Sequence, residues 1–454
     1  MDNIYVKDLV LATNGELLSG SLDLPIKDMV IDSRQVSETS LFVPIKGEKV
    51  DAHKFIADVL KTCNASLTMD SSILNDEIKS TGKALIKVDD SVNAMQAFAE
   101  YIRSKYSFPI IGVTGSVGKT TTREMIAKAL SAELNVLQTY KNYNSQVGVP
   151  MMISRFSDDY DIAVLEMGMS NHGEMERLAK MIKPDTAVMT LIGVAHIEQL
   201  KSQDGIYDEK INIVKYMSDN DIIFLNGDDA ILRRRASELS NRVLWYGLGQ
   251  DNDYKAYDLK IVDGEQHFYV DTPYAKKVLV KLKALGEHNV RNALVALANA
   301  ELYKVDIVKA AEALYDFSGQ RQQVINTDKG IIIDDSYNAS PESMKASISV
   351  LAGYECKGKR VAVLADMLEL GENEIKYHKL VGEYLKEYKI DYLIAYGELA
   401  KNYLEESAID GIHLDSLDAV YEECLKWLKP ANILLFKGSN GMNLKEVVNK
   451  LQKY

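Results

Sequence analysis

The segment GVTGSVGKTTT at residues 112–122 contains residue types that bind the phosphates of a nucleotide. Glycines in a turn before a helix let several backbone N–H groups point at one anion, and the helix N-terminus favours negative charge. Lys119 supplies a charge for the outer phosphates, and Thr120 supplies a hydroxyl for Mg²⁺. The spacing departs from the general phosphate-loop pattern, because Val113 stands where that pattern has its first glycine. The Lys-Thr pair and its flanking elements nevertheless predict a nucleotide site.

The flanking elements are those that a phosphate loop requires. The apolar run from Phe108 to Thr114 predicts a buried parallel strand, and TTREMIAKAL after it has helical spacing. Apolar strands alternate with helical segments up to about residue 318, and the alternation restarts at about residue 319. This alternation is typical of doubly wound parallel sheets. We therefore predict an α/β protein whose last two regions are separate α/β domains with substrates between them.

Three further residues follow strand candidates near the phosphate loop. Glu166 ends the strand IAVLEMG, and a carboxylate at that edge of the sheet is well placed to bind Mg²⁺. His196 follows the next strand at the same edge, although most histidines are packing or surface residues. Lys210 lies in a helical segment, where a lysine is normally a solvated residue. The alternative for Glu166 is an acid at the start of a helix.

Polar clusters also precede two later helices. In GEHNVRNALVALANA, Asn289 and Asn292 lie near a helix N-terminus, where they can hydrogen-bond a ligand or cap the helix. In DDSYNASPESM, Asp335 ends a strand, and Tyr337 and Asn338 form the turn into a helix. No cluster by itself names a reaction.

The composition excludes several classes of protein. A net charge of −13 argues against a nucleic-acid groove. The chain has no apolar run long enough to span a membrane, and its start (MDNIYVKDLV) lacks a signal-peptide pattern. We expect a cytoplasmic monomer with no nucleic-acid partner and no membrane span. Cys63, Cys356 and Cys424 are far apart, which favours reduced core cysteines over a disulfide or a zinc site.

Other motifs extend from one end of the chain to the other. They are DSR, SLFVPIKGEKVDAHKFI, NYNSQVGVP, LEMGMSNHGEM, GVAHIEQL, SGQRQQ, DDSYNASPESMKA and ADMLELGE. With the phosphate loop, their order and wording resemble the Mur ligase family over nearly the whole chain. The resemblance implies an N-terminal UDP-substrate-binding domain (1–107), a central ATP-binding domain with a mainly parallel sheet (108–318) and a Rossmann-like C-terminal ligase domain (319–454).

The resemblance also implies roles for individual residues. The residues implied to bind ATP are Gly115, Ser116, Val117, Gly118, Lys119, Thr120, Thr121, Asn292, Arg321 and Asp335. The implied metal site contains Thr120, Glu166, His196 and a carbamylated Lys210. The implied catalytic residues are Lys119, His196, Lys210 and Arg321. The residues implied to bind the UDP substrate are Ser33, Arg34, Lys46 and Gly47.

The implied reaction is the activation of a carboxylate by ATP with Mg²⁺. The γ-phosphate passes to the terminal carboxylate of a UDP-N-acetylmuramoyl tripeptide, and the amine of D-alanyl-D-alanine attacks the resulting acyl phosphate. Such an intermediate needs cations around crowded negative oxygens and protection from water. The residue types in these motifs meet that requirement.

Some positions depart from the family's usual wording. Asn440 and Asn443 stand where arginine is usual, which leaves the amine substrate open, since arginine is a natural partner for its carboxylate. Leu191 and Ser145 replace asparagines, and Ala52 replaces a glycine.

Two alternative functions are therefore considered. One is a ligase of this kind with another amine or acceptor, although the intact DSR and KGE segments favour a UDP-linked acceptor. The other is a nucleotide-binding regulatory protein without catalysis. The presence of Lys119, Glu166 and His196 argues against the second.

Overall fold

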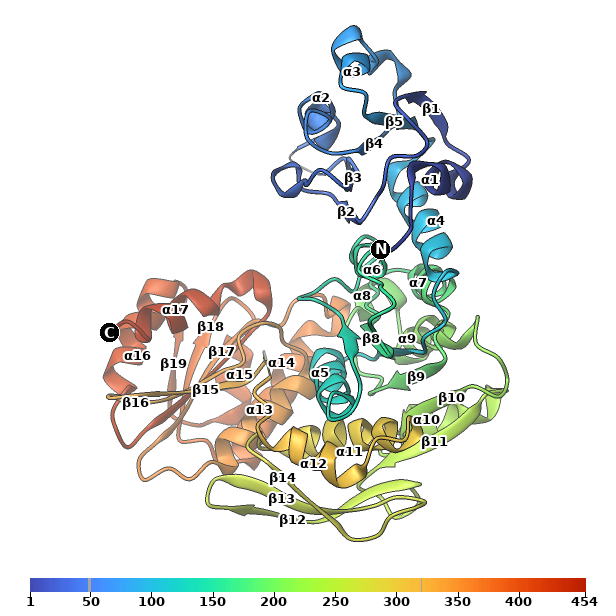
Figure 1. Cartoon of the computed structure of the whole chain (residues 1–454). Coiled ribbons are helices and arrows are strands. Elements are labelled where there is room, and N and C mark those ends of the chain that lie inside the picture. Colours follow the sequence, from blue (N-terminus) through green and yellow to red (C-terminus); the bar gives the residue numbers. More distant parts are fainter. Residues whose placement is uncertain (48–49, 320) are drawn as a thin grey trace.

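The computed structural model describes residues 1–47, 50–319 and 321–454, which contain three β-sheets with their helices (Figure 1). Glu48, Lys49 and Gln320, which belong to two of the motifs above, lie outside the described residues. The mixed α/β architecture with mostly parallel sheets confirms the predicted fold class. The domain boundaries proposed from the sequence stay predictions.

The N-terminal sheet has five strands in the order β1-β5-β4-β3-β2, of which β1 alone is antiparallel to its neighbour. Its strands are β1 (Glu16–Ser19), β2 (Asp28–Val30), β3 (Ser40–Phe42), β4 (Ala65–Thr68) and β5 (Ala84–Lys87). The helices of this region are α1 (Val6–Thr13), α2 (Ile56–Val59), α3 (Asp76–Ser80) and α4 (Ser91–Arg103). Asp90 caps α4 by accepting a hydrogen bond from the Asn93 backbone N–H.

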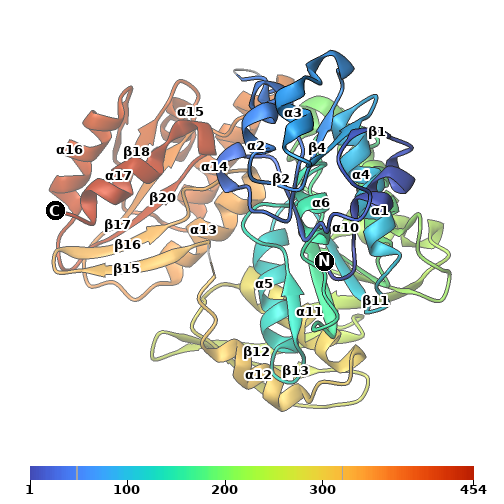
Figure 2. The same ribbon diagram turned by 45° about the horizontal axis from the view of Figure 1, so that its top comes forward.

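The central sheet has nine strands in the order β14-β13-β12-β11-β10-β9-β6-β8-β7. They are β6 (Ile110–Thr114), β7 (Val136–Gln138), β8 (Ile162–Glu166), β9 (Thr186–Met189), β10 (Ile222–Asn226), β11 (Arg242–Gly247), β12 (Tyr254–Val262), β13 (Glu265–Asp271) and β14 (Val278–Leu282). The helices are α5 (Lys119–Leu130), α6 (Gly148–Ile153), α7 (Glu174–Ile182), α8 (Ile197–Leu200), α9 (Gln203–Lys210), α10 (Ala230–Arg235), α11 (Glu287–Leu302) and α12 (Ile307–Tyr315). Helices α5 and α11 pack side by side (Figure 2). The fully buried β6 delivers the phosphate loop to the carboxyl edge of the sheet.

The C-terminal sheet has six strands in the order β15-β16-β20-β17-β18-β19, parallel except for β15. They are β15 (Gln323–Thr327), β16 (Gly330–Asp334), β17 (Arg360–Ala365), β18 (Tyr392–Tyr396), β19 (Gly411–Leu414) and β20 (Ile433–Lys437). The helices are α13 (Pro341–Gly353), α14 (Glu374–Glu387), α15 (Lys401–Ser407), α16 (Leu417–Trp427) and α17 (Leu444–Leu451). Ser340 caps α13, and Pro341 occupies its first position, where the missing N–H costs nothing.

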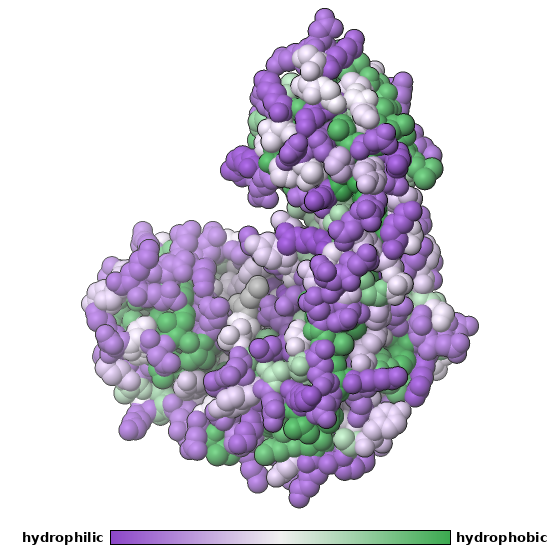
Figure 3. All heavy atoms as spheres, viewed as in Figure 1, coloured by the Kyte–Doolittle hydropathy of each residue, from purple (hydrophilic) through white to green (hydrophobic). Residues whose placement is uncertain are grey.

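One hydrophobic core joins the N-terminal and central sheets. Leu41 of β3 and Phe98 of α4 belong to the same buried cluster as Ala163 of β8 and Met175 of α7. Helix α4 packs on α1 of the N-terminal region and on α6 and α7 of the central region, which makes the cluster continuous. The C-terminal sheet has one apolar cluster on each face, and one of the two also contains Val194 and Leu285 of the central region. The outer surface is largely hydrophilic and is hollowed between the N-terminal and C-terminal parts (Figure 3).

The structure tests two expectations drawn from composition. Cys63, Cys356 and Cys424 are free thiols, and Cys63 and Cys424 are buried, as predicted. Cys356 is only partly buried, so its assignment to the core was wrong. Among the described helices, none has the length and apolar character needed to cross a membrane.

His378 of α14 lies in the core of the C-terminal region and must be neutral there. Its Nε2 accepts a hydrogen bond from the Met367 backbone N–H at 3.1 Å, so its Nδ1 carries the proton that is donated to the Glu374 carbonyl at 2.7 Å. The ring also stacks on Tyr403, with the ring centroids 5.0 Å apart. Burial is the main cause that lowers the pKa of His378.

We expect His378 to make the folded protein less stable as the pH falls. Its pKa is lower in the folded protein than in the unfolded chain, so the unfolded chain binds the proton first as the pH falls below about 6.5. The loss is at most about 1.4 kcal/mol per pH unit, the value for one proton. The measurement is the free energy of unfolding between pH 5 and 8 for the wild type and His378→Gln. An equal pH dependence in both proteins would contradict this assignment.

Candidate nucleotide and ligase site

The phosphate loop has a backbone shape that requires glycine. Gly115 and Gly118 have φ values of +144° and +86°, and a Cβ on Gly115 would lie 1.9 Å from Oγ1 of Thr190. The Ser116 backbone N–H donates to the Leu191 carbonyl at 2.9 Å. The segment that follows β9 thus packs against the phosphate loop and is hydrogen-bonded to it. The leucine that replaces the family's asparagine at 191 contributes its backbone carbonyl to this contact.

Lys119 opens helix α5 and folds back over the loop. Its ammonium donates to the carbonyls of Gly115 at 2.8 Å and Ser116 at 3.4 Å. Burial lowers the pKa of Lys119; the charge of Glu166 opposes that shift, and the charge of Arg321 adds to it. Thr120 and Thr121, which follow in the first turn of α5, are partly exposed. The loop is therefore a cationic helix N-terminus with a carboxylate nearby.

Glu166 ends β8 and is almost fully buried, with 2% of its surface exposed. Its Oε1 accepts a hydrogen bond from Asn144 Nδ2 at 2.7 Å, and its backbone N–H donates to Thr139 Oγ1 at 2.8 Å. Its Oε2 is buried without a hydrogen-bond partner among the described residues. A buried carboxylate oxygen without a partner is costly, so this atom is suited to bind a cation.

His196 follows β9 and faces the same edge of the sheet. Its φ of 65° is unusual for a residue other than glycine. The Nδ1 atom lies 3.2 Å from Oε2 of Glu369, in a geometry that forms no hydrogen bond. Burial, followed by the charges of Lys210 and Lys119, lowers the pKa of His196 to about 4. The imidazole is therefore neutral at neutral pH, the form that binds a metal ion.

Lys210 ends α9 with only 1% of its surface exposed. The alternative of a solvated surface lysine is therefore wrong. Burial lowers the pKa of Lys210 well below its ordinary value, and the charge of Lys119 lowers it further. Within the described part of the chain, Lys210 forms no ion pair with a carboxylate. Such a buried amine gives up its proton readily.

The two asparagines of α11 have different contacts. Asn292 accepts a hydrogen bond from Thr122 Oγ1 of α5 at 2.9 Å, and its Oδ1 would lie 3.5 Å from a Cβ on Gly118. Asn289 donates to the Leu285 carbonyl at 2.8 Å. Neither side chain caps α11, whose N-cap is a glycine. Asn292 is thus placed beside the phosphate loop, whereas Asn289 supports the preceding turn.

The C-terminal region contributes Arg321 and Asp335. The Arg321 guanidinium lies over the Tyr337 ring, and its charge lowers the pKa of Lys119. Asp335 follows β16, and its Oδ2 accepts hydrogen bonds from Lys437 Nζ at 2.6 Å and Ser347 Oγ at 2.5 Å. The structure therefore brings Arg321 toward the phosphate loop and holds Asp335 at the carboxyl edge of its own sheet.

Direct contacts join the central and C-terminal regions beside His196. Glu342 of α13 is partly buried, and its Oε1 accepts a hydrogen bond from the Val194 backbone N–H at 3.1 Å. Burial raises the pKa of Glu342. Together with the approach of Glu369 to His196, this contact joins two segments that are far apart in the sequence. Sequence reasoning assigned no role to either glutamate, because each acts through a contact between domains.

The residues predicted to bind the UDP substrate lie together on another sheet. Ser33 and Arg34 follow β2, and Lys46 and Gly47 follow β3, which is paired with β2 in parallel. Both loops therefore share one edge of the N-terminal sheet, apart from the phosphate loop (Figure 1). Arg34 is highly exposed and forms a two-bond ion pair with Asp32 at 2.9 and 2.7 Å.

Two further features bear on where the site lies. Across the described ranges, no three His, Cys, Asp or Glu side chains are grouped to hold a metal ion by themselves. Metal binding at Glu166 and His196 would therefore need additional ligands.

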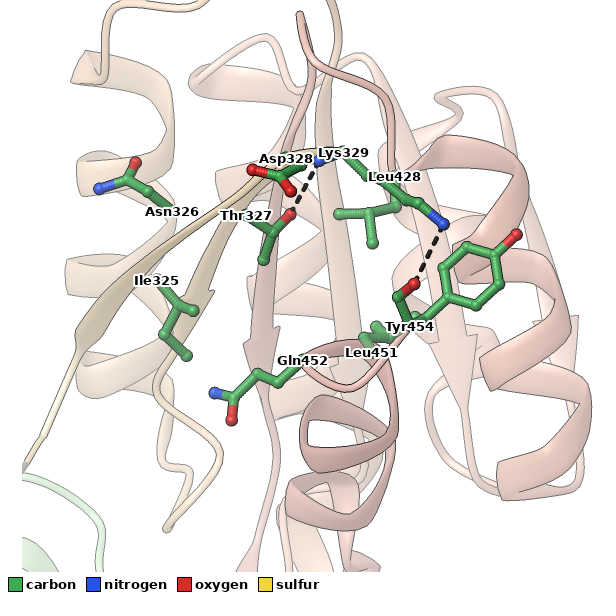
Figure 4. Close-up of a pocket in the computed structure, with 9 residues that line it drawn as sticks. All are labelled: Ile325, Asn326, Thr327, Asp328, Lys329, Leu428, Leu451, Gln452 and Tyr454. Carbon is green, nitrogen blue, oxygen red and sulfur yellow. Dashed lines mark hydrogen bonds between the residues drawn. The ribbon is translucent and has the colours of Figure 1, made fainter.

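A separate pocket in the C-terminal region is lined by residues that include Lys329, Leu451 and Tyr454 (Figure 4). It adjoins the turn before β16, at the opposite edge of the sheet from Asp335.

Comparisons with known proteins agree with this arrangement. The Mur ligase middle domain matches residues 113–300, and the Mur ligase glutamate ligase domain matches residues 320–440. UDP-N-acetylmuramoyl-tripeptide–D-alanyl-D-alanine ligase from Bacillus subtilis is 34% identical over 96% of each chain, and the Escherichia coli ligase of the same name is 30% identical over 100% of this chain and 99% of its own.

Solved structures of Mur ligases also resemble this chain. A crystal structure of MurF from Acinetobacter baumannii superposes with a TM-score of 0.90 at 28% identity over 99% of each chain. A crystal structure of MurF ligase from Thermotoga maritima in complex with ADP has a TM-score of 0.83 at 28% identity, covering 94% of this chain and 97% of its own. The chain belongs to the Mur ligase family.

Proposed function

We propose that this protein is an ATP-dependent ligase that joins D-alanyl-D-alanine to a UDP-N-acetylmuramoyl tripeptide in peptidoglycan precursor synthesis. The proposal rests mainly on one observation: five ionisable side chains interact electrostatically at one edge of the central sheet. They are Lys119, Glu166, His196, Lys210 and Arg321. The names of the relatives supply the substrates.

ATP binding follows from the phosphate loop. The loop N–H groups and the N-terminus of α5 receive the phosphates, and the Lys119 ammonium leaves its carbonyl partners to bind them. Asn292, beside the loop, contacts the adenine, and Asp335 contacts the ribose. The ADP complex of the Thermotoga maritima relative supports the binding of an adenine nucleotide.

Magnesium fits the donor atoms at the edge of the sheet. The unpartnered Oε2 of Glu166 and the neutral imidazole of His196 would hold the metal, together with the Thr120 hydroxyl and oxygens of the substrates. Bound Mg²⁺ neutralises charge on the phosphates and on the acceptor carboxylate. A carbamate formed on Lys210 adds oxygen donors to the same site.

The chain's own cations assist the transfer. Lys119 and Arg321 bind the γ-phosphate oxygens as this group passes to the acceptor carboxylate, and they offset its charge. The contact of Glu342 with Val194 closes the central and C-terminal regions against each other, which limits the access of water to the acyl phosphate. Ser33, Arg34, Lys46 and Gly47 bind the uridine nucleotide of the acceptor.

A phosphate-release assay tests the function directly. With ATP, Mg²⁺ and a UDP-N-acetylmuramoyl tripeptide, we expect phosphate release to require D-alanyl-D-alanine and to exceed that with single amino acids or other dipeptides. Asn440 and Asn443 are exposed and uncharged where the family usually has arginine, so the assay includes dipeptides with altered C-terminal residues. Preference for another amine would establish the alternative, a ligase of the same family with a different amine substrate. The monomeric state and cytoplasmic location stay predictions.

A further inference from the structure

Arg321 has one close partner that could fix its guanidinium. Its Cζ lies 3.6 Å from the centroid of the Tyr337 ring, which is the geometry of a cation–π contact. Within the described residues, the Arg321 side chain donates no hydrogen bond and forms no ion pair. All of its N–H donors are thus available to an anion, and its position depends on the aromatic ring beneath it.

The turn that carries Tyr337 is fixed by hydrogen bonds, although Tyr337 itself is 46% exposed. It lies in the turn between β16 and α13, and Lys437 fixes this turn on both sides of the tyrosine. The Lys437 ammonium donates to Asp335 Oδ2 at 2.6 Å and to the Asn338 carbonyl at 3.0 Å. The Lys437 side chain is only 2% exposed, so solvent does not compete for these contacts.

The stacked guanidinium lies near the phosphate loop. The charge of Arg321 lowers the pKa values of both Lys119 and Arg123, which lie one turn apart on α5. Arginine suits a site of this kind, since its planar group can stack on an aromatic face and still donate hydrogen bonds from its edge. Stacking on the ring thus leaves the N–H groups at the edge of the guanidinium free to bind an anion.

We propose that Tyr337 is a positioning residue that holds the Arg321 guanidinium by stacking, on a turn fixed by the buried Lys437. The proposal rests on the proposed function, because Arg321 is there assigned to the γ-phosphate. Tyr337 acts through Arg321 and needs no contact with a substrate. Its phenol hydroxyl is not required, so a phenylalanine at this position retains the role.

A double-mutant cycle tests the proposal. The variants are Tyr337→Leu, Tyr337→Phe, Arg321→Ala and Arg321→Ala with Tyr337→Leu. We expect Tyr337→Leu to lower kcat by about 2- to 30-fold, the range of a cation–π contact, with a smaller change in the KM for the UDP-tripeptide. Tyr337→Phe should keep a rate near that of the wild type. In the Arg321→Ala background, Tyr337→Leu should cause no further loss.

The double-mutant cycle distinguishes a failure of this proposal from a failure of the proposed function. An equal loss from Tyr337→Leu in both backgrounds would show that Tyr337 acts independently of Arg321 and would overturn the proposal, as would a Tyr337→Phe enzyme as slow as Tyr337→Leu. Full activity of Arg321→Ala would instead refute the role of Arg321 in the proposed function. Crystal structures of the wild type and Tyr337→Leu with ADP decide the stacking without an activity measurement. An Arg321 guanidinium in the same place in both would also overturn the proposal.

Discussion

Lys119→Ala is expected to abolish ATP-dependent ligation while the protein stays folded. Among the described residues, the ammonium donates hydrogen bonds only to loop carbonyls, so its removal breaks no direct ion pair. Its charge is needed when the γ-phosphate is transferred, and the loss of such stabilisation costs about 10²- to 10³-fold or more in kcat. Phosphate release under saturating substrates measures the loss, and thermal unfolding checks the fold.

Lys128→Ala is the matched control for this result. Lys128 lies on the same helix, α5, and is exposed to solvent. It should keep a rate near that of the wild type, because a general loss of positive charge on α5 does not affect phosphate transfer. Near-normal ligation by Lys119→Ala would remove the basis for placing the phosphates at this loop.

Lys210→Ala is expected to be nearly inactive and to regain part of its activity with acetate or formate. Burial lowers the pKa of the Lys210 amine and so favours its neutral form, and a neutral amine adds to the carbon of CO₂ with loss of one proton to give a carbamate. The product replaces a cation, which would repel Mg²⁺, with an anion whose oxygens bind it. A small carboxylate that enters the space left by the side chain supplies similar oxygens.

Lys215→Ala provides the comparison for Lys210. Lys215 lies five residues later, is about half exposed and pairs with Glu176 at 2.7 Å. Its removal should change the rate little, and added acetate should have no effect on that variant. A fully active Lys210→Ala enzyme would rule out the carbamate. Electron density that ends at Nζ of Lys210 in crystals grown with bicarbonate would also count against it.

The parts of the fold that could be predicted are those with strong local patterns. Buried strands such as Ile110–Thr114 and Ile162–Glu166 are continuous apolar runs, and their carboxyl ends indicated where Glu166 and Lys119 would meet. The antiparallel strands β12 to β14 were not predicted. Buried and partly exposed residues alternate along β13. This pattern is typical of an antiparallel sheet with one face packed on the core, whereas the sequence pattern predicted a parallel sheet buried on both faces.

The candidate site was predicted in part for a related reason. Lys119, Glu166 and His196 follow strands of one parallel sheet, so chain order alone places them at a common edge. The burial of Lys210 could not be predicted, because its helical segment has the polar composition of a surface helix. The contacts of Glu342 and Glu369 depend on how two separate sheets pack together, and no local pattern encodes that packing.

The core shared by the N-terminal and central sheets has a consequence for how the molecule loses its structure. Because Leu41, Phe98 and Met175 belong to one buried cluster, the first two sheets cannot melt separately without exposing each other's apolar residues. The clusters of the C-terminal sheet include only two buried residues of the central region, Val194 and Leu285, so this sheet depends less on its neighbour. We therefore expect the first two sheets to unfold together as one cooperative unit. A destabilising substitution in the N-terminal sheet therefore weakens the nucleotide-binding sheet as well, at a distance from any residue that contacts ATP.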